Sequence, residues 1–220
     1  MDLTTILNVL GTGFFAISGA LAGIRNRMDL LGVVIMGFFV GLGGGTICNI
    51  CLGIPPVWLK DVTYVWAVVA PSLITFAIMW HFRQHGKKHL FSKRTAIISR
   101  ICFLTFDAFG LGLFAITGTQ LALHMGVGTV GSMLMGMITA VGGGMIRDLC
   151  CNDIPLIFQR DIYATAALIG GGIYIAIRPD MPMHSAEIFS VVLVIVIRLV
   201  SVYRNWQVPR IGEESPAKIP

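Results

Sequence analysis

The chain has 220 residues, of which 55% are hydrophobic and only 12% are charged, and its mean hydropathy is +0.82. Water-soluble enzymes, nucleic-acid-binding modules and disordered scaffolds are disfavoured, because each requires polar surface that this composition does not supply. The net charge is +5. The five cysteines lie within or beside apolar runs, which indicates buried thiols rather than a secreted disulfide framework.

Apolar runs predict seven membrane-spanning helices, since one span requires about 20 apolar residues. The predicted spans are 3–24, 30–59, 62–80, 101–123, 128–158, 162–177 and 186–203. The first run has no basic leader and no small-residue cleavage site, so we interpret it as a retained helix and not as a signal peptide. The expected fold class is therefore an all-α membrane protein.

Basic residues concentrate on one side of this topology. Five of them lie in a single stretch, 83–96. Positive loops stay in the cytoplasm, which places the N-terminus outside and the tail 205–220 inside. Topology thus explains the basic charge without nucleic acid, and contact of this loop with anionic membrane lipids is compatible with the same placement.

A sequence repeat divides the chain. Phe15 to Gly19 recurs 99 residues later as Phe114 to Gly118, with a threonine in place of the serine, and other glycines match at the same offset. Each copy contains three spans, so the second copy crosses the membrane in the inverted sense, as in many transport proteins. The expected organisation is a first repeat 1–82, a basic cytoplasmic loop 83–96, a second repeat 97–178, a seventh helix 186–204 and a tail 205–220.

Glycine triplets lie in the middle of the second and fifth spans, at 43–45 and 142–144. The second span has thirty residues, which would extend about 45 Å as one helix, against a hydrocarbon core of about 30 Å. Three adjacent glycines weaken a helix by roughly 3 kcal/mol, so a kink or an unwound turn is expected there. The triplets could instead allow close helix packing. We expect the kink or unwound turn, with the two breaks lining a polar path.

Charged residues close to these triplets are costly in a membrane and therefore suggest function. Asp107 lies within the fourth span, and Arg147 and Asp148 follow the second triplet. They form either an ion-attracting and gating group or a neutralised pair that joins two helices. Hydroxyl groups could replace ion hydration or bond their own helix. The candidate pathway residues are Gly43, Gly44, Gly45, Thr46, Gly142, Gly143, Gly144, Ser18, Thr117 and Asp107, and the candidate gating pair is Arg147 and Asp148.

Several other kinds of site are not indicated. Cys48 and Cys51 have C-x-x-C spacing but no second ligand pair, so no metal is expected. A phosphate-binding G-x-x-x-x-G-K-[ST] segment and the usual catalytic motifs do not occur in the sequence. We therefore expect neither an enzyme nor a cofactor.

Five segments resemble the prokaryotic members of the trimeric intracellular cation (TRIC) channel family. They are Phe15 to Gly19, Leu42 to Ile47, Asp107 to Gly112, Gly142 to Asp148 and Ile162 to Ala167. The resemblance covers the chain to about residue 204. It implies a homotrimer in a prokaryotic inner membrane, with a pore for potassium through each protomer and with the second and fifth helices kinked at the glycine triplets. Relatives often have Arg-Asp after both triplets, whereas the first copy here reads Cys48-Asn49.

Two functions remain open at this point. A monovalent cation channel, permeable to potassium and weakly discriminating against sodium, is the first. A secondary carrier for a small neutral amino acid such as glycine is the alternative, because inverted repeats with discontinuous helices are equally typical of carriers.

Overall fold

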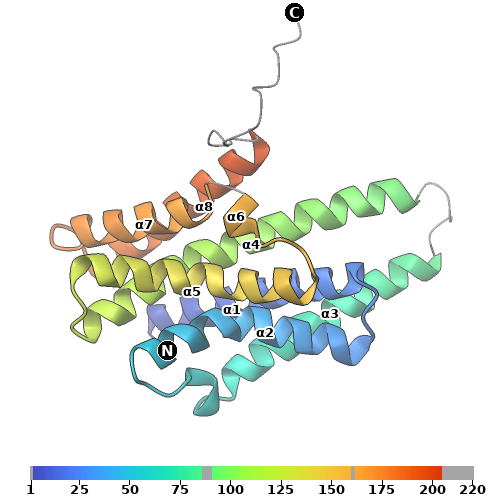
Figure 1. Ribbon diagram of the computed structural model, residues 1–220, viewed down its shortest axis with the longest axis horizontal. Helices are drawn as coiled ribbons and strands as arrows, with labels where there is room; N and C mark the ends of the chain where they lie inside the picture. Colours follow the sequence, from blue (N-terminus) through green and yellow to red (C-terminus); the bar gives the residue numbers. More distant parts are fainter. Residues whose placement is uncertain (1, 86–90, 160–161, 205–220) are drawn as a thin grey trace, which may run out of the picture.

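Helices make up almost all of the chain that the structure describes, which comprises residues 2–85, 91–159 and 162–204 of a computed structural model (Figure 1). In order they are α1 (Leu3–Arg25), α2 (Leu30–Cys51), the 3-10 helix η1 (Val57–Leu59), α3 (Thr63–His85), α4 (Phe91–His124), α5 (Thr129–Cys150), α6 (Leu156–Gln159), α7 (Ala164–Ile177) and α8 (Met183–Tyr203). Six of these helices are long and apolar enough to cross a membrane, and α7 is a shorter apolar helix. The chain is thus an all-α, multi-pass membrane protein.

The helices pack as two similar halves. In the first half α1 contacts α2 and α3, and in the second half α4 contacts α5 and α7. The halves meet through the pairs α1–α4 and α2–α5, while α8 packs against α4 and α7 (Figure 1). This arrangement leaves α8 outside the repeated unit, as the sequence predicts.

Contacts between the two halves are reciprocal. Phe15 of α1 packs on Phe114 of α4 with 5.4 Å between ring centroids, and these two residues are repeat equivalents of one another. A methyl group on Gly11 would lie 3.4 Å from the ring of Phe114, and one on Gly110 would overlap the ring of Phe15. Reciprocity of this kind indicates an approximate two-fold axis between the halves.

The second and fifth spans are shorter than predicted, and the expected length is wrong. The helix α2 ends at Cys51 because Gly53 takes a left-handed conformation with φ of 70°, and α5 ends at Cys150 because Asn152 takes the same conformation with φ of 56°. Residues in this conformation stop helices by capping their last carbonyl groups. The remaining apolar residues form connections that contain η1 and α6, so α2 and α5 have only 22 residues each.

The predicted unwound turn at the glycine triplets is also wrong, whereas the kink that the sequence offered beside it stays a prediction. Helical structure continues from Leu30 to Cys51 and from Thr129 to Cys150, through both triplets. Intrinsic propensity is overridden by packing at these positions, since the glycines bring two helix backbones together.

Helical structure also extends into the segment expected to be a loop, 83–96. The helix α3 continues to His85 and α4 begins at Phe91, so both project past the other helices at the right of Figure 1. Residues 86–90, which carry Lys87 and Lys88, and the tail 205–220 lie outside the described residues. The described part of α4 has 34 residues, of which Arg100–His124 form the apolar span.

Candidate functional site

The glycine triplets form the crossing point of α2 and α5. A methyl group on Gly44 would collide with the carbonyl oxygen of Thr139, and one on Gly143 would collide with that of Val40. Thr139 is the repeat equivalent of Val40, so these two contacts are symmetric. Only glycine permits this backbone approach. Close packing, which the sequence left as the alternative, is therefore the main role of Gly44 and Gly143.

The other triplet glycines have different surroundings. A methyl group on Gly45 would meet no atom within 4 Å, because this glycine faces an open cavity, whereas one on Gly43 would meet the side chain of Ile146. Gly142 packs against the Cα atom of Gly44. A methyl group on Gly144 would lie 2.8 Å from the Tyr163 hydroxyl, so this glycine makes room for the polar cluster at the end of α5.

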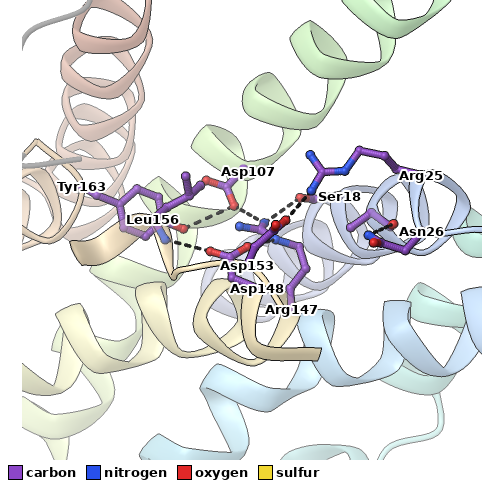
Figure 2. Close-up of polar contacts among 10 residues, drawn as sticks. Ser18, Arg25, Asn26, Asp107, Arg147, Asp148, Asp153, Leu156 and Tyr163 are labelled. Carbon is purple, nitrogen blue, oxygen red and sulfur yellow. Dashed lines mark hydrogen bonds and ion pairs between the residues drawn. The ribbon is translucent and has the colours of Figure 1, made fainter. Parts of the chain in front are cut away.

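The candidate gating residues form a buried ionic cluster, which we call the arginine cluster (Figure 2). Its members are Ser18, Asp107, Arg147, Asp148 and Tyr163. The Arg147 guanidinium donates to Asp107 Oδ1 at 2.5 Å, to Asp148 Oδ1 at 2.8 Å and to the Ser18 hydroxyl at 3.0 Å. The Tyr163 hydroxyl donates to Asp107 Oδ1 at 3.3 Å. These contacts join α1, α4, α5 and the start of the α7 segment through one cation.

Burial makes this cluster energetically demanding. Arg147 and Asp107 are both fully buried, and the guanidinium also lies 4.4 Å from the ring centroid of Phe103. Removal of one partner from a buried ion pair costs about 3–5 kcal/mol, because the other charge is left without compensation. Asp107 Oδ2 and Arg147 Nη2 have no hydrogen-bond partner within the described chain. The cluster is thus held by its charges and is not completely satisfied.

A connecting segment covers the end of the arginine cluster. Asp148 Oδ2 accepts a hydrogen bond at 2.8 Å from the backbone N–H of Leu156, the first residue of α6. On the surface, Arg25 at the end of α1 pairs with Asp153 at 2.5 Å (Figure 2). The segment between α5 and α6 is therefore attached both to the buried cluster and to α1.

A cavity of about 740 Å³ opens at the opposite end of the bundle. It lies among the start of α1, the ends of α2 and α4, η1 and the starts of α3 and α8. Its lining combines apolar side chains with polar ones, and Asp2 contributes a carboxylate. The polar side of the lining includes Thr4, Asn8, Thr12, Gly45, Thr46, Cys48, Asn49, Trp58, Tyr64, Thr117, Gln120, Thr139 and His184.

The cavity is the repeat equivalent of the arginine cluster. Every member of the cluster, and Phe103 beside it, has its counterpart 99 residues away in the cavity lining. The pairs are Thr4 and Phe103, Asn8 and Asp107, Cys48 and Arg147, Asn49 and Asp148, Tyr64 and Tyr163, and Thr117 and Ser18. One hydrogen bond to the backbone is kept in both repeats. Asp148 accepts from the N–H of Leu156, and the Asn49 side-chain oxygen, in the amide orientation that satisfies both of its polar atoms, accepts from the N–H of Val57 at 3.2 Å. The large difference is that cysteine replaces arginine and amides replace carboxylates, so the space is left open.

The structure divides the predicted site residues into two groups. Gly45, Thr46 and Thr117 line the cavity, whereas Ser18 and Asp107 belong to the arginine cluster. Asp107 does not face a wet cavity, and its charge is used by Arg147. The sequence interpretation missed the cavity residues Asn8, Asn49 and Gln120, although the repeat offset from Asp107 and Asp148 was a signal for the first two.

Together the fold and the site define a class of protein: a multi-pass membrane protein of two repeated three-helix units, with a cavity at one end of the bundle and a buried arginine at the repeat-equivalent place toward the other end. The chain belongs to the family whose model is described as "Glycine transporter", which matches it twice, over residues 5–80 and 104–179.

Similar proteins extend this assignment over almost the whole chain. A UPF0126 membrane protein of Deinococcus radiodurans is 38% identical over 91% of this chain and 87% of its own length. The UPF0126 inner membrane protein YadS of Escherichia coli K12 is 34% identical over 92% of this chain and 93% of its own.

Solved structures of prokaryotic TRIC channels have the same fold. The TRIC orthologue from Rhodobacter sphaeroides is 33% identical, with a TM-score of 0.79 over 94% of this chain and 100% of that one. A second TRIC cation channel is 38% identical, with a TM-score of 0.77 over 97% of this chain and 100% of that one. The family resemblance drawn from the sequence is therefore confirmed, and the chain belongs to the same family as these proteins.

Proposed function

We propose that this protein is a monovalent cation channel, chiefly for potassium, with one ion pathway in each protomer of a homotrimer. The similarity to solved TRIC cation channels supports the activity, and the name of the R. sphaeroides protein supports the trimer. The E. coli relative is described as an inner membrane protein, which supports the same location here. The chain then crosses that membrane seven times, with inverted repeats and its N-terminus outside.

One observation carries the mechanism: the cavity and the arginine cluster occupy equivalent places in the two halves. In the proposed pathway a cation enters the cavity from outside and passes beside the α2–α5 crossing. It reaches the cytoplasm only when Arg147 leaves Asp107, because the guanidinium otherwise fills the inner half. The arginine cluster is then the gate, and Asp107 becomes available to the permeant ion when the gate opens.

The test is current across a planar bilayer that contains the purified protein, under a potassium gradient. Discrete steps that reverse near the potassium equilibrium potential are the expected result. The family description favours a second candidate, a glycine carrier. A silent bilayer together with saturable glycine uptake into liposomes would contradict the channel and establish the carrier. A variant in which Arg147 and its two carboxylate partners are neutralised together tests the gate in the same experiment. It should carry a larger potassium current than the unchanged protein.

A further inference from the structure

Four of the six threonines that line the cavity share one hydrogen-bond arrangement. Each hydroxyl donates to the carbonyl oxygen four residues earlier in its own helix, at 2.6 to 3.1 Å. They are Thr12, Thr46, Thr117 and Thr139, on α1, α2, α4 and α5. A hydroxyl whose hydrogen is used in this way has only oxygen lone pairs left for a ligand. At these four positions, four helices therefore contribute hydroxyl oxygens that can only accept.

These acceptors do not have equal capacity. Thr46 already accepts a hydrogen bond from Trp58 Nε1 at 3.0 Å, which leaves its oxygen largely satisfied. Within the described chain, no hydrogen bond is made to the hydroxyl oxygens of Thr12 or Thr117. A ligand of the cavity is therefore expected to contact these two residues first.

A carboxylate behind the cavity wall adds negative potential. Gln120 lines the cavity and donates from Nε2 to Glu187 Oε1 at 2.7 Å. Glu187 is fully buried, and its other oxygen lies 3.8 Å from Nδ1 of the exposed His184. The nearest charge partner is thus beyond hydrogen-bond distance, and a cation in the cavity would experience the field of Glu187 through Gln120.

The equivalent place in the other half already contains a cation. There the Arg147 guanidinium is fixed by two carboxylates and by the Ser18 hydroxyl, whose repeat equivalent is Thr117. The cavity keeps the hydroxyl and loses the covalently attached cation and both carboxylates. Hydroxyl oxygens without a directly bound carboxylate hold a monovalent cation weakly enough to release it, which conduction requires.

We propose that the cavity is a binding site for a partly dehydrated monovalent cation, coordinated by the hydroxyl oxygens of Thr12 and Thr117 at the place that Arg147 fills in the other half. This site rests on the proposed cation conduction, since it would be the outer station of that pathway. An anion is disfavoured by the carboxylate of Glu187 behind the cavity wall.

The test is thermal unfolding of the purified, detergent-solubilised protein in potassium chloride and in N-methylglucamine chloride of equal ionic strength. A cation that binds the folded state raises Tm, and a rise of a few degrees is expected in potassium. Thr117→Val keeps the side-chain shape but removes the oxygen, so it should abolish most of this rise. Thr119→Val is the matched control: its hydroxyl makes the same bond to its own helix, two residues along α4, but Thr119 does not line the cavity.

Each outcome decides the proposal. An equal rise in Thr117→Val, or no rise in the unchanged protein, would overturn the site. If Thr117→Val does not fold, Thr12→Val on α1 tests the same site. Potassium currents without a potassium-dependent rise in Tm would reject the binding site but not the channel function. A potassium-dependent rise in Tm without currents would support the binding site and reject the channel function.

Discussion

Cys48 and Arg147 occupy the same position in the two repeats, yet one lines an open cavity and the other is enclosed on every side. The enclosing groups of Arg147 include Asp107 and Phe103, whose equivalents beside Cys48 are Asn8 and Thr4. The fold places the same backbone in both halves, so the side chains alone decide which half is closed. A single cation fixed by two carboxylates makes the pathway asymmetric.

The first prediction transfers the chemistry of the cavity to the arginine cluster. Arg147→Cys, Asp107→Asn and Asp148→Asn, made together, copy the residues of the first repeat. Because all three charges leave at once, no uncompensated buried charge remains, and the fold should be kept. Loss of a gate worth even 1.4 kcal/mol raises the ratio of open to closed states about tenfold. Single-channel recording should therefore show at least about a tenfold increase in that ratio.

Asp153→Asn is the control for this variant. It removes a carboxylate from the same end of the bundle, but Asp153 pairs with Arg25 on the surface and not with the arginine cluster. Exposed pairs contribute about 0–1 kcal/mol, so the open probability should change little. An unchanged open probability in the triple variant, with protein that inserts and unfolds normally, would mean that the arginine cluster is structural and not a gate.

The second prediction is the reverse exchange. Cys48→Arg, Asn8→Asp and Asn49→Asp recreate the arginine cluster in the cavity. An arginine held by two carboxylates should fill the space beside Thr117, and potassium current should fall at least about tenfold. Asn8→Asp alone adds a carboxylate without a cation, so it should not reduce current. Equal current in the triple variant and the unchanged protein would show that ions do not pass through the cavity.

Much of the fold could be predicted because the two repeats kept recognisable residues. Phe15 and Phe114 are both a sequence match and a direct contact in the structure. The helix ends were missed because the apolar run continues beyond Cys51, although Gly53 and the prolines after it are ordinary signals of a helix end. Hydrophobicity alone does not distinguish a membrane helix from the apolar connection that follows it.

The site was harder to predict than the fold. The pairing of Arg147 with Asp107 depends on how α5 is placed along α4, and that register is set by contacts such as the one between Gly136 and the Ala115 carbonyl. The cavity leaves even less signal in the sequence, because it exists where the large side chain of the other repeat is missing. Its trace in the aligned repeats is the replacement of Arg147 by Cys48, together with Asn8 and Asn49 in place of the two aspartates.

The third prediction separates packing glycines from cavity glycines. Gly44→Ala introduces a methyl group against the Thr139 carbonyl, and overpacking of this kind costs about 1–3 kcal/mol. Gly45→Ala meets open space and should stabilise the helix by up to about 1 kcal/mol. For a chain of this size each kcal/mol corresponds to about 2–4 °C in Tm. Thermal unfolding in detergent should therefore show Gly44→Ala below Gly45→Ala by several degrees.

Gly143→Ala extends the same experiment to the second repeat. Its methyl group would collide with the Val40 carbonyl, so its Tm should fall by about as much as that of Gly44→Ala. If Gly45→Ala were the less stable of the two α2 variants, the assignment of Gly44 to the helix crossing would be wrong.

The fourth prediction concerns ion selectivity. Strong selection of potassium over sodium requires several carbonyl groups that replace the hydration shell together, as in tetrameric potassium channels. The cavity offers hydroxyl oxygens such as those of Thr12 and Thr117 on separate helices, with room for water between them.

Such a site dehydrates the ion only in part, so we expect a permeability ratio of potassium to sodium between about 1 and 5. Chloride should be excluded, because the carboxylate of Glu187 lies behind the cavity wall. Reversal potentials with potassium on one side and sodium on the other measure this ratio. A ratio above about 100 would contradict the weakly coordinating cavity and would require a narrow, multi-carbonyl filter elsewhere on the pathway.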